Sequence, residues 1–392
     1  MSLYKDLIQG SKADISPLTL PKQVQENWVY EHSLLRDDYD RSYTKFLCRK
    51  FMSFNGKSSL FLCINVICLP ISLLLFLYFL LRGLFTIRIG RKMSGKEKAV
   101  VLLPSSFKDI SDILPLESLE AYKEWEYVTP KRYAKSYLKG ISLLIYLKVA
   151  SQHPLSGYYH LLCLMTLADY TRIIHTHSPQ AIYTFADEKN FAKPLATLLC
   201  ENFCIDHIGF MHGECFYQID KGFFRYSAYY TWDKFYSELF REMRCECPMY
   251  EYSPKRISSK SYPHKDNYPI YLTYYESTNN EESLKIVGNI FKRMLSEGKK
   301  VLYRPHPRFA KMDVVREYIP NECIQDPRSV SIDDSILQSR YIASICSTVL
   351  YESFCGGKTI VVDDISDPDQ HKSIIEKGFI VMSKPHKLLS EL

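Results

Sequence analysis

The chain has little glycine for its length and no excess of proline: 15 Gly and 19 Pro occur among 392 residues. This scarcity excludes collagen-like and low-complexity material. Twelve cysteines are present, but no two have C-x-x-C spacing, which argues against a zinc ribbon. They are scattered, several within apolar runs, and are expected to be reduced, buried thiols. Residues 1–20 lack an apolar core, so no signal peptide is expected.

A strong charge of one sign is also lacking, because 50 basic and 44 acidic residues give a net charge of +6. Without a dense basic patch, no nucleic-acid partner is expected. Apolar residues make up 46% and charged residues 24%, which excludes wholesale disorder. The length predicts two or three domains.

One long uncharged run occupies residues 60–81, and about 20 apolar residues suffice to cross a bilayer. Pro70 is expected to divide it into two pieces. Because basic residues flank both ends, the positive-inside rule assigns no orientation. The pattern favours a re-entrant hairpin or an anchor near one leaflet of the membrane, at its cytoplasmic face. A spanning helix and a buried core helix are the alternatives.

After this run, short apolar strands alternate with segments of helical length, which indicates parallel sheets covered on both faces. We therefore predict an α/β protein with two Rossmann-like domains behind a hydrophobic, membrane-associated helical segment. The predicted parts are an N-terminal helical region (1–57), the membrane segment with a basic connector (58–95), a first Rossmann-like domain (96–252), a linker (253–267) and a second Rossmann-like domain (268–392).

Ligands of open α/β sheets bind beyond the carboxyl ends of the strands, and a stiff turn follows one predicted strand there. His306 stands between Pro305 and Pro307, which restrict the backbone. Arg304 and Arg308 add positive charge on either side. A fixed imidazole beside guanidinium groups suits a phosphate or nucleotide. The alternative is a rigid turn with a surface histidine.

A second candidate is Ser347-Thr348, which ends a predicted strand and begins a helix. Hydroxyls and free N–H groups at a helix N-terminus form an anion site. Glu352, about one turn later, is suited to accept ribose hydroxyls, and Lys358 follows two glycines. Ordinary helix capping is the alternative for Ser347 and Thr348.

Three residues that follow strands of the first domain are candidates for catalysis. Asp187 comes after a predicted strand and is a candidate general base. His212 and Glu214 flank a glycine after the next strand, where a titratable ring and closely approaching backbone are available. The alternatives are a helix N-cap for Asp187 and a structural histidine.

These motifs together resemble a known family. The run RPHPR, followed about 40 residues later by STVLYESFCGGKTIVVDD, resembles the nucleotide-binding half of two-domain (GT-B) glycosyltransferases. It looks most like the group that uses CMP- or CDP-activated donors: bacterial sialyltransferases and polysialyltransferases, capsule Kdo transferases and CDP-glycerol glycerophosphotransferases. The His-Gly-Glu turn also resembles the last of these. The resemblance covers roughly residues 100–364.

The resemblance implies roles for individual residues. His306 and Pro307 would match the His-Pro motif that meets the cytidine phosphate, and Ser347 and Thr348 would match the Ser/Thr pair at the phosphate. Glu352 and Lys358 would match positions near the ribose, and Asp187 a base-like acid. Many members of the family need no metal, and neither a metal nor another cofactor is expected.

The expected function is transfer of a sugar from a nucleotide-sugar donor to a glycan or lipid-linked acceptor during surface polysaccharide synthesis. Asp187 or His212 would deprotonate the acceptor hydroxyl; the residue types leave both open. Two alternatives are a polyol-phosphate transferase of teichoic-acid type and a non-catalytic GT-B-like assembly subunit.

Overall fold

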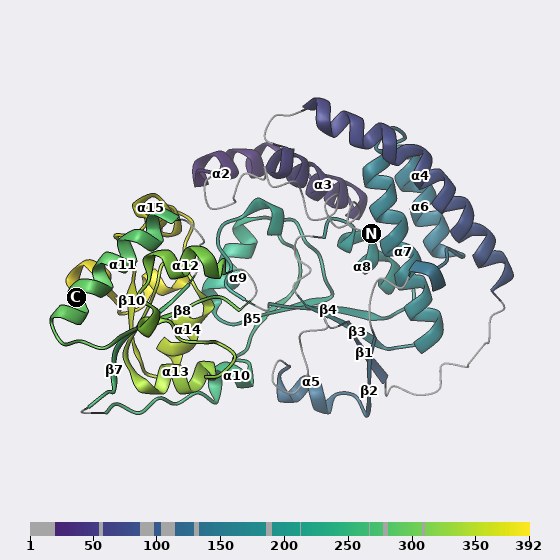
Figure 1. Ribbon diagram of the computed structural model, residues 1–392. Coiled ribbons are helices and arrows are strands. Elements are labelled where there is room, and N and C mark those ends of the chain that lie inside the picture. The colour runs from purple at the N-terminus through teal and green to yellow at the C-terminus, as the bar shows by residue number, and fades with distance from the viewer. Residues whose placement is uncertain are drawn as a thin grey trace. The chain divides into compact units, whose positions relative to one another are not determined.

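The computed structural model describes residues 20–54, 58–86, 98–102, 114–128, 133–185, 190–211, 213–265, 267–276, 281–307 and 310–392. The chain divides into two compact units, shown as ribbons in Figure 1. Unit 1 is the chain up to His212 together with Tyr217–Tyr252, and unit 2 is Gly213–Phe216 together with Ser253–Leu392. The short segment Gly213–Phe216 therefore belongs to unit 2, although residues of unit 1 flank it on both sides.

Unit 1 contains a parallel sheet with the strand order β2-β1-β3-β4-β5-β6 in the part of the chain described. Its central strands are apolar and buried on both faces, as a parallel sheet covered by helices requires. The strands are β1 (Lys98–Leu102), β2 (Glu124–Tyr127), β3 (Ala181–Phe185), β4 (Asp206–Phe210), β5 (Ala228–Thr231) and β6 (Met249–Glu251).

The helices of unit 1 include a long buried one, α7, whose side chains form the centre of the largest apolar cluster. The helices are α2 (Lys22–Glu31), α3 (Asp38–Phe54), α4 (Ser58–Phe85), α5 (Leu116–Glu120), α6 (Ile141–Gln152), α7 (Gly157–His177), α8 (Lys193–Glu201) and α9 (Lys234–Glu242). Helix α6 begins directly after Gly140, whose φ of 58° is a backbone conformation that residues with side chains disfavour.

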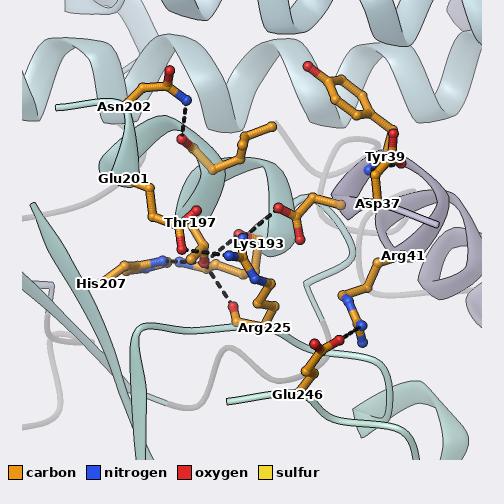
Figure 2. A network of polar contacts seen from close by, with 12 residues as sticks. Asp37, Tyr39, Arg41, Lys193, Thr197, Glu201, Asn202, His207, Arg225 and Glu246 are labelled. Carbon is orange, nitrogen blue, oxygen red and sulfur yellow. Dashed lines mark hydrogen bonds and ion pairs between the residues drawn. The ribbon is translucent and has the colours of Figure 1, made fainter. Parts of the chain in front are cut away.

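Helix α3 is docked on the rest of unit 1 by charged and polar contacts, which Figure 2 shows in part. Arg41 pairs with Glu246 and donates to the carbonyl of Arg244 at 2.9 Å. The guanidinium of Arg225 donates to Asp38 at 2.5 Å. Burial raises the pKa of Asp38 to about 6, against the opposing effect of Arg225. The residues before α4 are thus held to the same unit as those after it.

Helix α4 is continuous through Pro70, so the prediction of two pieces is wrong. Proline removes one backbone donor, but α4 packs against α7 on both sides of it. Asn65 accepts from the backbone N–H of Tyr158 in the first turn of α7 at 3.2 Å. Beyond Pro70, Phe79 is fully buried in the same apolar cluster.

Unit 2 contains a second parallel sheet, with the strand order β11-β10-β9-β7-β8 among the described residues. The strands are β7 (Ile270–Tyr275), β8 (Val301–Arg304), β9 (Ser339–Ser344), β10 (Thr359–Val362) and β11 (Lys387–Leu388). The helices are α10 (Lys255–Ser258), α11 (Glu281–Ser296), α12 (Met312–Tyr318), α13 (Ile332–Gln338), α14 (Thr348–Cys355) and α15 (Pro368–Glu376). The predicted α/β class, with two parallel sheets and one long apolar helix, is confirmed.

Candidate functional site

The strand order of unit 2 marks one place on its sheet for ligand binding. The chain passes from β7 to β8 on one side and then continues with β9 and β10 on the other. The direction of winding therefore changes between β7 and β9, and such a switch point opens a crevice beyond the carboxyl ends of the strands. The residues that follow β7, β8 and β9 are therefore the candidates for contact with a ligand.

The turn after β8 is held by a carboxylate that the sequence analysis missed. The backbone N–H of His306 donates to Oε2 of Glu276, the residue after β7, at 2.6 Å. The N–H of Glu276 in turn donates to the carbonyl of Arg304 at 3.0 Å. Glu276 is buried, which raises the pKa of its carboxyl, while the bond from His306 opposes that shift. Its position directly after an apolar strand was the available signal.

Arg304 itself is buried and engaged within unit 2. Its guanidinium donates to Gln325 and to the carbonyl of Val330, both at 2.8 Å. Burial lowers the pKa of this guanidinium. Arg304 thus connects residues 325–330 to β8 by hydrogen bonds. Its contact with the phosphate of a nucleotide-sugar donor stays a prediction. Pro307 is exposed, and Arg308 lies outside the described residues.

The residues after β9 form the N-terminus of α14. Ser347 is extended, with φ of −149°, and its side chain accepts from the N–H of Val349 at 3.3 Å. Thr348 is the first residue of the helix, and both side chains are partly exposed. A capped but solvent-accessible helix start offers backbone N–H groups and hydroxyls to an anion.

The segment after β4 meets this helix start. A Cβ built on Gly213 would lie 3.8 Å from Oγ1 of Thr348, which is ordinary contact distance. Burial is the main cause that raises the pKa of Cys346 to about 12, and the negative charge of Glu214 is the second cause. Glu214 therefore lies near Cys346, two residues after the end of β9. Unit 2 therefore brings Gly213 and Glu214 close to the residues that lead from β9 into α14. His212 is outside the described residues.

The Gly-Gly-Lys run after α14 serves the packing of unit 2. Nζ of Lys358 donates to the carbonyl of Ser339 at 2.7 Å, and burial, with the charge of Lys265, lowers its pKa to about 8. A Cβ on Gly356 would lie 2.2 Å from the ring of Tyr262. Contact of Lys358 with a ribose stays a prediction, as does that of Glu352, which is partly exposed on α14.

In unit 1 the corresponding switch point lies between β1 and β3. Asp187 follows the end of β3 by two residues in sequence, but it is outside the described residues, and its role as a base stays a prediction. The described histidine of β4, His207, lies at the amino end of its strand. Its imidazole forms a hydrogen bond with Thr197 at 2.7 Å (Figure 2). A second hydrogen bond joins it to Tyr170 at 3.0 Å, and burial lowers its pKa far below the ordinary value. That histidine belongs to the structural network under α3.

The described part of unit 2 therefore has, after the carboxyl ends of β8 and β9, the turn that carries His306 and a helix start with the hydroxyls of Ser347 and Thr348. This set can bind an anion and stabilise negative charge. Within the described ranges, no group of three or more His, Cys, Asp and Glu side chains is arranged to hold a metal ion.

Comparisons with known proteins add likenesses at the level of structure only. No family model and no curated protein match the chain. A putative UDP-N-acetylglucosamine 2-epimerase from Listeria monocytogenes is 13% identical, with a TM-score of 0.44 over 68% of this chain and 79% of that one. The wall teichoic acid polymerase TagF is 12% identical, with a TM-score of 0.41 over 79% and 80%. The calicheamicin glycosyltransferase CalG4 is 10% identical, with a TM-score of 0.40 over 75% and 85%. Likenesses this distant do not assign an activity.

Proposed function

We propose that this chain is a GT-B-type glycosyltransferase that binds a nucleotide-activated sugar, CMP- or CDP-linked, in unit 2. It transfers the sugar to a glycan or lipid-linked acceptor at the cytoplasmic face of a membrane. The observation that carries the proposal is that β8 and β9, the two strands paired with β7, are followed by the His306 turn and by the N-terminus of α14.

The chemistry of transfer suits these groups. An acceptor hydroxyl attacks the anomeric carbon, the bond from that carbon to the phosphate oxygen breaks, and a base takes the hydroxyl proton. Asp187 and His212 remain the two candidates for that base. The departing nucleotide gains negative charge on its phosphate, which N–H groups and hydroxyls at a helix N-terminus stabilise. Ser347 and Thr348 stand at such a terminus.

Nucleotide binding by the full-length protein tests the donor site. CMP, CDP, UDP and GDP are titrated calorimetrically, and cytidine nucleotides are expected to bind most tightly. Thr348→Val removes a hydroxyl while keeping the shape of the side chain, and should weaken binding by about 1.5–3 kcal/mol, the range for a hydrogen bond to a charged group. Ser347→Ala and His306→Ala should weaken binding by a similar amount.

Matched controls separate binding from folding. Ser296→Ala changes the last residue of α11, which precedes β8, and His386→Ala changes the residue before β11. Both variants should bind nucleotide like the unchanged protein. Ser347→Ala also removes a helix cap, which costs about 1 kcal/mol of stability, so Thr348→Val is the cleaner variant. Unchanged binding in Thr348→Val and His306→Ala together would refute the donor site.

A further inference from the structure

Helix α4 exposes an apolar face along its whole length. Val66, Leu74 and Leu84 are 62%, 68% and 71% exposed. The other apolar side chains of this face that are at least 45% exposed are Leu62, Ile67, Ile71, Leu73, Leu77, Leu81 and Phe85. Among described helices, α4 has the length and apolar composition to cross a membrane. An uncharged face of this size is unusual on a water-soluble surface and indicates an apolar partner.

The opposite face of α4 is packed on unit 1 from one end to the other. Its buried residues recur at helical spacing: Phe61, Asn65, Cys68, Ser72, Phe79 and Gly83. Glycines make this contact close. A Cβ on Gly157 of α7 would lie 2.4 Å from the carbonyl oxygen of Asn65, and one on Gly83 would lie 2.0 Å from that of Leu138. Figure 1 shows α4 running beside α7. A helix surrounded by lipid would have to give up this whole contact.

Both flanks of α4 are folded into the same unit. The preceding helix, α3, is bound to unit 1 by the ion pair of Arg41 with Glu246. Its Ser42 hydroxyl also donates to the carbonyl of Phe191 at 2.8 Å and accepts from the hydroxyl of Tyr159 at 2.9 Å. The first strand after α4, β1, lies inside the sheet. A helix that crossed the bilayer would place these two flanks on opposite sides of it. The folded unit requires them to be on one side.

Basic side chains lie at both ends of α4. Lys50 stands over the ring of Phe61 near its start, at 4.9 Å. Near its end, Arg82 donates to the hydroxyl of Tyr78 at 3.1 Å, and Lys139 donates to the carbonyl of Thr86 at 3.0 Å. Positive charge at both ends suits a helix whose ends meet the same layer of anionic headgroups.

We propose that α4 is an in-plane anchor, which lies flat in one leaflet of an anionic membrane with its exposed face among the acyl chains and its packed face on unit 1. The proposal rests on the membrane association in the proposed function and specifies how it is achieved. Unit 1 stays folded while attached, because none of its core contacts has to open.

Flotation of the full-length protein with vesicles of phosphatidylcholine and phosphatidylglycerol tests the surface. The triple variant Leu73→Ser, Leu74→Ser and Leu77→Ser should bind the vesicles at least tenfold more weakly, with an unchanged melting temperature, because these side chains lie outside the core. A control with Leu155→Ser, Ile332→Ser and Ile375→Ser removes comparably exposed apolar side chains elsewhere and should bind normally. Equal binding by the two triple variants would overturn the proposal.

Topology distinguishes an in-plane helix from a spanning one. A short epitope is inserted after Leu34, before α4, or after Leu155, beyond it; both leucines are at least 80% exposed in loops. In right-side-out and inside-out membrane vesicles, the two epitopes should be reached by protease from the same side. Accessibility from opposite sides would show a spanning helix. A stable dimer in solution that does not float would show that a second copy covers the face, and would also overturn the proposal.

Nucleotide titration of the same preparations keeps the two proposals apart. Normal nucleotide binding without vesicle binding refutes the anchor and leaves the donor site standing. Vesicle binding without nucleotide binding refutes the donor site and leaves the anchor standing.

Discussion

Glu276 shows how one side chain can position a functional turn. Its carboxylate accepts the N–H of His306, and its own N–H bonds to Arg304, so β7 and the turn after β8 are fixed to each other at the switch point. A buried donor that loses its acceptor costs about 1–3 kcal/mol. The group that holds His306 is therefore as important for a preorganised site as the histidine itself.

We expect Glu276→Ala to lower the free energy of unfolding by about 1–3 kcal/mol, because it leaves the N–H of His306 without its acceptor. The variant should also weaken nucleotide binding. Glu276→Gln keeps an oxygen acceptor of the same reach and should retain most of both properties. Urea unfolding and calorimetric titration measure the two effects. Equal losses in both variants would contradict a role as hydrogen-bond acceptor.

At the scale of elements, the close crossing of α4 and α7 decides what kind of helix α4 is. The crossing depends on glycine at position 157, where an added methyl group would meet the backbone of Asn65 and Leu69. Backbone cannot rotate aside as a flexible side chain can, so the two helices would have to separate. Stability therefore reports whether α4 is packed on unit 1.

Gly157→Ala is expected to destabilise the protein by about 1–3 kcal/mol, the usual cost of overpacking a filled interface. Gly213→Ala serves as the control, because its Cβ would find ordinary contact distances and its φ is not positive. Chemical unfolding of both variants measures the difference. No loss of stability in Gly157→Ala would mean that α4 does not rest on α7 in solution.

At the scale of the whole molecule, the division into units does not follow a single cut in the sequence. Gly213–Phe216 is separated from the rest of unit 2 by Tyr217–Tyr252 of unit 1. The rings of Phe216 and Phe379, both buried, are 5.4 Å apart. The segment Gly213–Phe216 thus packs on unit 2 through Phe216 and lies beside Thr348 through Gly213.

Phe216→Ala should lower the stability of unit 2 by about 3 kcal/mol, as for large-to-small changes in a core. Hydrogen exchange should then speed up in β7 and β9, while β3 and β4 of unit 1 keep their protection. Phe85→Ala removes the same side chain from a position that is 81% exposed and should change neither unit. Faster exchange confined to unit 1 in Phe216→Ala would contradict the assignment of this segment.

Two of the strands that the sequence did not predict, β2 and β6, lie at the edges of their sheet. β2 and β6 each pair with one neighbour only, and their side chains are largely exposed. Edge strands need no continuous apolar run, so EWEY and MYE carry little signal. The apolar runs of β1, β3 and β4 did indicate strands, whereas β5, which pairs with a neighbour on both sides, was not predicted.

The amino-acid sequence by itself determined the α/β class, the parallel sheets and the strand ends that carry His306 and Ser347-Thr348, because burial on two faces and turn chemistry are local properties. Only the tertiary structure decided that Glu276 holds His306 from 30 residues away, and that α4 is continuous with one face on protein. Hydropathy could not decide the second point. Leucines that face a core and leucines that face outward are chemically identical, and the covered face is the one that packs closely on Gly157 of α7.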